Sequence, residues 1–171
     1  MRATHTGAAA GLMSQPGRSP RPMLHTHSTT RMPSGTIVLT LEGEMPVEFL
    51  SAGDRIITRN TGTARLTGIR QWSETQQAVR FAPGSLGDTR PDCALILPAD
   101  QRLLIRDWRA KALFGTPQAV VEARALIDGE FIRDLGAQDL QLTELQFDRP
   151  RVVYAGGLEL ATTDSPARAA A

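Results

Sequence analysis

Residues 35–58 read GTIVLTLEGEMPVEFLSAGDRIIT, and this stretch decides the expected fold. Residues 36–41 are rich in β-branched side chains and end at a Glu-Gly pair, a dipeptide that is typical of turns. Pro46 can begin a short helical turn, because its missing N–H is not needed at such a start. A Gly-Asp pair at residues 53–54 then leads into a second strand. The stretch therefore predicts a strand, a tight turn, a short helical turn and another strand.

The composition of the 171-residue chain bounds its function. Hydrophobic residues make up 41% and charged residues 22%, which is ordinary for a globular domain. The net charge of +1 favours neither nucleic acid nor an acidic membrane as a partner, and no apolar run approaches the roughly 20 residues that span a bilayer. Cys93 is the only cysteine, which excludes an internal disulfide and a cysteine-rich zinc site. Its apolar neighbours predict a buried thiol.

Both ends of the chain differ in composition from its middle. Residues 1–34 mix Ala, Gly, Ser, Thr and Pro with four arginines and no acid. We expect a disordered basic tail there, because this composition cannot bury enough apolar surface to offset its ordering entropy. A transit peptide shares the composition, but three prolines would break its amphipathic helix. Residues 163–171 are small and polar and are expected to form a flexible C-terminal tail. The domain is therefore expected to span residues 35–162, and we expect the protein to be cytoplasmic.

Beyond residue 58 the sequence consists mostly of short apolar segments separated by turns. An Asn-Thr-Gly turn at residues 60–62 predicts a hairpin. A short helical turn is expected at residues 123–127. The expected strands are residues 64–72, 78–82, 93–97, 102–106, 118–122, 140–147, 151–155 and 158–162. Many short strands with closely spaced turns predict an all-β fold.

Short motifs in a fixed order connect this chain to a known family. They are Gly35-Thr36, Pro46-Val47-Glu48, Gly53-Asp54, Ile69-Arg70-Gln71-Trp72, Leu113-Phe114-Gly115, Val121-Glu122-Ala123 and Phe147-Asp148-Arg149. Their order and spacing resemble the Hint (Hedgehog/intein) domain, most closely its bacterial Hint-like members. The resemblance covers roughly residues 32–162. It implies a compact, curved β fold of pseudo-twofold design.

The resemblance also implies where self-processing chemistry would reside. Hint domains begin with an N–S or N–O acyl shift at a Cys or Ser that lies four positions before the Gly-Thr pair, where this chain has Arg31. A guanidinium stays protonated and is no nucleophile at neutral pH. A Thr-x-x-His motif then supplies a proton, and Pro98 and Gln101 stand at its two positions. A side-chain amide cannot transfer a proton as an imidazole does.

A third family histidine often follows an Asp-Arg pair near the end of the domain, and Pro150 stands at that position. The histidines of this chain are His5, His25 and His27, all in the predicted tail. The predicted body therefore has no side chain whose unperturbed pKa lies near neutrality. His25 and His27 alone do not complete a zinc site of about four ligands.

We therefore expect a catalytically inactive Hint-like domain, not an enzyme and without cofactor or metal, that acts as a scaffold or binds a protein partner. One alternative is an active self-cleaving protein that uses a different nucleophile. The candidate hydroxyls near the start of the domain are Ser28, Thr29, Thr30 and Ser34. Another alternative is a subunit of a larger bacterial assembly, in which the basic tail orders as an anchoring strand on binding.

Overall fold

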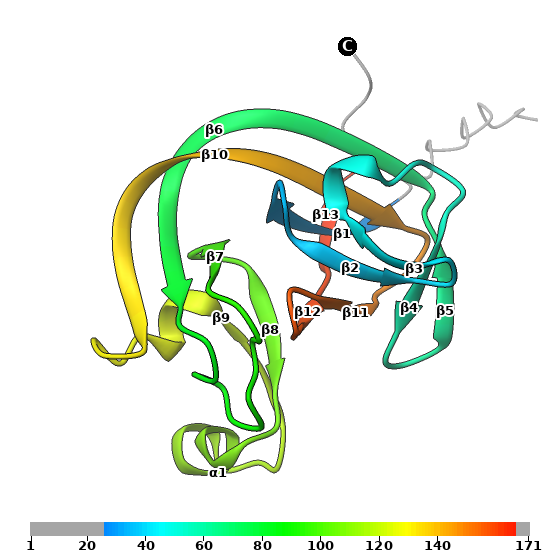
Figure 1. Cartoon of the computed structure of the whole chain (residues 1–171). Helices are drawn as coiled ribbons and strands as arrows, with labels where there is room; N and C mark the ends of the chain where they lie inside the picture. The colour runs from blue at the N-terminus through cyan, green and yellow to red at the C-terminus, as the bar shows by residue number, and fades with distance from the viewer. Residues whose placement is uncertain (1–25, 167–171) are drawn as a thin grey trace, which may run out of the picture.

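The computed structural model describes residues 26–166, in which thirteen strands form two antiparallel sheets (Figure 1). One sheet has the order β13-β1-β10-β6-β7, and the other has the order β3-β2-β4-β11-β12-β8-β9, with β5 paired to β4. The strands are β1 (Thr26–Pro33), β2 (Ile37–Thr40), β3 (Gly43–Pro46), β4 (Arg55–Thr58), β5 (Gly62–Arg65), β6 (Gly68–Phe81), β7 (Leu95–Pro98), β8 (Arg102–Ile105), β9 (Ala119–Glu122), β10 (Ile132–Phe147), β11 (Val152–Ala155), β12 (Leu158–Ala161) and β13 (Thr163–Pro166). The all-β prediction is confirmed.

The opening stretch folds as predicted, with one addition. β2 and β4 are the two predicted strands, and the 3-10 turn η1 (Val47–Phe49) begins directly after Pro46. The addition is β3, which pairs back on β2 across the turn at residues 41–42. Asp54 shapes the next turn, because its Oδ2 accepts the backbone N–H of Ser51 at 2.8 Å.

Two long strands, β6 and β10, pair along most of their length and arch over the molecule (Figure 1). They contain 14 and 16 residues, whereas the sequence predicted shorter strands at residues 64–72, 78–82 and 140–147. Their middle parts, residues 73–77 and 137–139, are polar except for Ala137 and are mostly exposed on both faces. Such segments lack the alternation that reveals a strand in a sequence, although backbone pairing continues through them.

Ordered strands extend beyond the predicted domain at both ends. Residues 26–33, assigned to the disordered tail, form β1, and residues 163–166, assigned to the C-terminal tail, form β13. β1 lies between β10 and β13, with Ser28, Thr30 and Met32 buried. The hydroxyls of Ser28 and Thr30 can be buried because each has a hydrogen-bond partner from a distant part of the sequence, Asp164 and Gln101 respectively. The rest of the two predicted tails, residues 1–25 and 167–171, lies outside the described residues.

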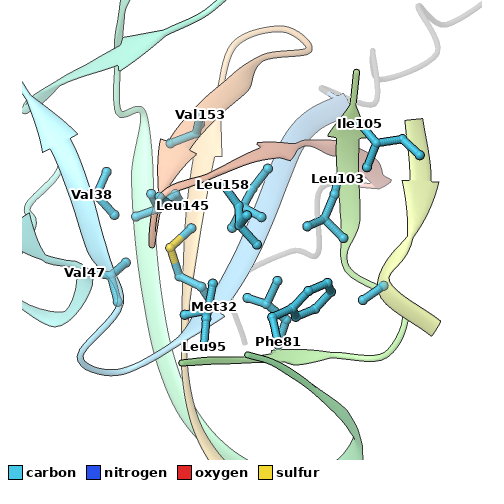
Figure 2. Packing of buried hydrophobic residues seen from close by; sticks show 14 of the residues in the cluster. Met32, Val38, Val47, Phe81, Leu95, Leu103, Ile105, Leu145, Val153 and Leu158 are labelled. Carbon is cyan, nitrogen blue, oxygen red and sulfur yellow. The ribbon is translucent and has the colours of Figure 1, made fainter. Parts of the chain in front are cut away.

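The main core lies between the two sheets. Its largest fully buried side chains include Phe81, Phe147 and Met32. Figure 2 shows Met32 in the middle of this core, among residues from both sheets. Cys93, predicted to be buried, is exposed instead. It lies two residues before β7, outside the strand whose alternation turns Leu95 and Leu97 inward, so that alternation does not reach it.

Two short helical segments complete the part of the chain that the structure describes. The 3-10 turn η2 (Ala123–Leu126) was predicted, whereas the helix α1 (Trp108–Phe114) was not. α1 does have sequence signals at both ends: the Asp107 side chain accepts the N–H of Arg109, and Gly115 ends the helix with φ of 71°. No helix among residues 26–166 is long and apolar enough to cross a membrane.

Met32→Ala tests whether β1 belongs to the folded domain. Met32 is fully buried, so removing its side chain should lower the free energy of unfolding by about 2–5 kcal/mol. Leu41→Ala is the control, because Leu41 is exposed and its loss should cost no more than about 0.5 kcal/mol. Urea denaturation of both variants measures the difference. Equal effects would show that β1 is not packed against the core.

Candidate functional site

A groove of about 270 Å³ lies where β1 and β13 meet the turn between β7 and β8. It contains Arg31 and Gln101, two of the residues that the family resemblance places at self-processing positions. The residues that line it are Thr29, Thr30, Arg31, Asp100, Gln101, Arg102, Glu122, Glu144, Thr163, Asp164 and Ser165. Residues 70 positions apart in the sequence thus share one groove.

Gln101 is buried and uses both ends of its side-chain amide. Its Oε1 accepts hydrogen bonds from the backbone N–H of Arg31 and from Thr30 Oγ1, each at 3.3 Å. Its Nε2 donates to the backbone carbonyls of Arg102 at 2.8 Å and Ala161 at 3.3 Å. The side chain therefore ties β1 of one sheet to β8 and β12 of the other. It contacts the peptide bond between residues 30 and 31.

The side chain of Arg31 is engaged by an ion pair with Asp100, the residue next to Gln101. Both groups are partly exposed, so solvent screens this pair and its effect on stability is small. Arg31 lies opposite Glu144 in the β1–β10 register. The guanidinium at the predicted nucleophile position therefore has acidic residues, Asp100 and Glu144, on two sides.

The two prolines at predicted positions differ in their relation to the groove. Pro98 is the buried last residue of β7, and its carbonyl accepts the backbone N–H of Gln101 at 3.0 Å, which shapes the turn that presents Gln101. Pro150 is exposed in the connection between β10 and β11, and its carbonyl accepts a hydrogen bond from Asn60 Nδ2 at 3.3 Å. It does not line the groove. The structure thus brings Pro98 close to Gln101 through a backbone contact and leaves Pro150 apart.

The four alternative hydroxyls occupy different environments. Ser28 is buried and its Oγ donates to Asp164 Oδ1 at 2.9 Å, whereas Thr30 donates to Gln101. Thr29 lines the groove, and Ser34 is exposed after the end of β1. Ser28 is therefore the hydroxyl of this set that has a carboxylate partner. Residues 35–166 contain no histidine, as predicted, but the ordered domain begins earlier and includes His27, which lies in β1 opposite Ser165 of β13.

The sequence did not single out Arg151, which is almost fully buried directly after Pro150. Its Nη1 donates to Thr61 Oγ1 at 2.7 Å and its Nη2 donates to Asp148 Oδ1 at 2.9 Å. The hydrogen bond from Arg151 lowers the pKa of the Asp148 carboxyl, and the charges of Arg151 and Arg149 lower it further against the opposing effect of burial. Asp148 also forms an ion pair with Arg149, with a distance of 3.3 Å, on the surface.

A second buried ion pair was also missed. Glu159 on β12 is 5% exposed and accepts hydrogen bonds from Arg106 Nε at 3.0 Å and Arg106 Nη2 at 2.7 Å, and it pairs with Arg59 Nη1 at 3.1 Å. The hydrogen bond to Glu159 raises the pKa of Arg106 despite partial burial. These contacts connect the ends of β4, β8 and β12, so the cluster has a structural role.

The acidic residues of the groove do not form a metal site. Within residues 26–166, no group of three or more His, Cys, Asp and Glu side chains is placed to hold a metal ion. Arg31 neutralises Asp100, and Arg70 Nε lies 3.9 Å from Glu144 Oε1. The groove is thus a surface of mixed charge rather than a cation-binding cage.

Comparison with known proteins identifies the family. The family profile described as the Hint domain matches residues 32–164, so the chain belongs to the Hint domain family. A bacterial intein-like domain from Clostridium thermocellum is 14% identical, with a TM-score of 0.51 over 78% of this chain and 99% of that chain. The gp41-1 intein is also 14% identical, with a TM-score of 0.43 over 77% of this chain and 97% of that chain. No curated protein sequence matches the chain.

Gln101→Leu tests whether the amide holds β1 in place. The variant leaves the N–H of Arg31 and the carbonyl of Ala161 without their partner, which should cost about 1–3 kcal/mol. Amide hydrogen exchange at Arg31 should also become faster. Gln141→Leu, at an exposed position of β10, is the matched control and should change neither quantity. Unchanged exchange at Arg31 would contradict the role assigned to Gln101.

Asp148→Asn tests the ion pair beside Pro150. The pKa of Asp148 is lower in the folded state than in the unfolded state, so the pair stabilises the protein above about pH 4 and loses this effect as the pH falls through the folded-state pKa. The variant should therefore be less stable at neutral pH, by less than about 1 kcal/mol because the carboxyl is half exposed, and should lose less stability on acidification. Urea denaturation at several pH values measures this, with Glu42→Gln as the control.

Proposed function

We propose that this Hint domain does not cleave its own backbone and serves instead as a protein-binding or scaffolding module. The observation that supports the proposal most directly is the contact between Gln101 Oε1 and the N–H of Arg31. Gln101 occupies the position where the family resemblance expects a histidine, next to the peptide bond that self-processing would break. The contact is a hydrogen bond in which the peptide nitrogen donates.

The acyl shift needs two groups that this arrangement does not supply. A side chain at position 31 must attack the carbonyl carbon of Thr30, and the departing nitrogen of residue 31 must gain a proton. A guanidinium stays protonated at neutral pH and has no lone pair for the attack, and that of Arg31 is engaged in an ion pair with Asp100. The oxygen of the Gln101 amide has no proton to give.

The segment that precedes position 31 is held in the sheet by strand pairing on both of its sides. Residues 28–33 pair with β10, and residues 26–29 pair with β13 on the other side. The chain before residue 26, which carries Arg2, Arg18 and Arg21 and no acid, therefore joins the domain through a strand inside a sheet. A scaffold that presents this basic segment to a protein partner is the role that fits this attachment.

Intact-mass spectrometry of the purified full chain tests the lack of self-cleavage. The chain should remain a single 18.5 kDa species during incubation with dithiothreitol or hydroxylamine, because no acyl shift generates an ester or thioester for these reagents to attack. A fragment that begins at Arg31 would overturn the proposal. A fragment that begins at Ser28, Thr29, Thr30 or Ser34 would overturn it as well, in favour of an active domain with a different nucleophile.

Restoring the expected residues tests why cleavage is absent. The triple variant Arg31→Cys, Pro98→Thr and Gln101→His places a thiol and an imidazole at positions that already meet in the structure. It should release residues 1–30 in a reaction that depends on added thiol. Gln101→His alone is the control and should stay intact, because it has no nucleophile. A triple variant that folds, as urea denaturation shows, and yet stays intact would contradict this explanation.

A further inference from the structure

The sheet that contains β2, β4 and β11 has apolar side chains on its outer face, where polar side chains are expected because that face points away from the core. Along β2, β4 and β11, the residues that face the core are Val38, Thr40, Ile56, Thr58, Val153 and Ala155. The alternating residues face outward, and four of them are Ile37, Leu39, Ile57 and Tyr154. An antiparallel sheet with one solvated face normally carries polar side chains there. These four residues line a groove of about 570 Å³, with residues 90–95 along one side.

Charged residues of opposite sign flank this apolar surface. On one side, Glu44 of β3 lies directly opposite Leu39 of β2, so the two side chains share a face. On the other side, Arg55 of β4 lies directly opposite Arg65 of β5, a pairing of like charges that is unfavourable by itself. None of these three side chains forms an ion pair within residues 26–166. Across the strands, the outer face therefore has an unpaired carboxylate at one edge (Glu44), apolar side chains in the middle, and two unpaired guanidinium groups at the other edge (Arg55 and Arg65).

We propose that this face binds the same face of a second copy of the chain, which gives a twofold-symmetric dimer. A twofold axis that lies in the contact plane and runs along the strands exchanges the two edges of the face, so a residue on one edge meets the opposite edge of the other copy, and each such contact occurs twice. When the apolar centres of the two faces meet, Glu44 of each copy comes to the side of Arg55 and Arg65 of the other. The dimer buries the apolar residues and gives both arginines an acidic partner.

A second copy accounts for the charge pattern better than a partner of single charge. A uniformly acidic partner would be repelled by Glu44, and a uniformly basic one by the two arginines. Packing of two sheets face to face, with their strands nearly aligned, is a common way to bury such a surface. The self-association uses neither Gln101 nor the groove around Arg31, so it is independent of the function proposed above.

Charge reversal tests the proposed dimer. Sedimentation velocity of the full chain over a range of micromolar concentrations should show a monomer–dimer equilibrium. Glu44→Arg or Arg55→Glu should each raise the dimer dissociation constant by about tenfold, and the double variant should return to within about threefold of the parent because the pair is re-formed with its signs exchanged. Glu130→Arg, an exposed acid in the turn before β10, is the matched control and should leave the constant unchanged.

The single cysteine provides a second readout. Cys93 is exposed and lines the same groove, so its reaction with a maleimide should slow as the parent chain is concentrated. In Glu44→Arg the rate should not depend on concentration. A chain that stays monomeric throughout would overturn the proposal. A dimer that neither charge reversal weakens would overturn it as well, because it would use another surface.

Discussion

The pairing of β10 with both β1 and β6 is the constraint on which the rest of the structure depends. β10 is the one strand of the five-stranded sheet that pairs with an N-terminal and a mid-chain segment at once. Its last residues, Leu145 and Phe147, are fully buried in the core between the sheets. Because these residues must face inward, the register of β1 is set by them. That register brings Thr30 and Arg31 next to Gln101 in the turn that follows β7.

The side chain of Gln101 keeps β1 in place, and the same side chain is central to the proposed loss of self-cleavage. Gln101 satisfies the N–H of Arg31 and a carbonyl of β12 with one buried amide. A histidine at this position could move a proton, whereas a glutamine keeps both its donors and its acceptor in fixed use. Under the proposed function, the contact that would orient a scissile peptide bond in a self-processing relative is a structural contact here. In that role, the contact helps to keep β1 paired within the domain.

Local signals in the sequence were enough for some elements and misleading for others. The strands and turns of residues 35–58 were predictable because each follows from short-range propensities. β1 and β13 were missed because Ser28 and Thr30 are polar, and their burial depends on Asp164 and Gln101, which are distant in sequence. The middle of the β6–β10 arch was missed because both of its faces are polar. Cys93 was placed in the core because an apolar run does not reveal where its strand begins.

The family and the all-β class were determined by the sequence itself, because motifs and strand patterns are local properties; the assignment of Arg31, Pro98, Gln101 and Pro150 to self-processing positions stays a prediction from the same motifs. Only the tertiary structure decided that Arg31 and Gln101 meet, that Pro150 lies elsewhere, and that Arg151 and Glu159 are buried ion-pair partners. It also decided that Ile37, Leu39, Ile57 and Tyr154 line one groove on the outer face of a sheet. The physical reason is that contacts between distant segments depend on strand register, and register is set by the packing of the whole core.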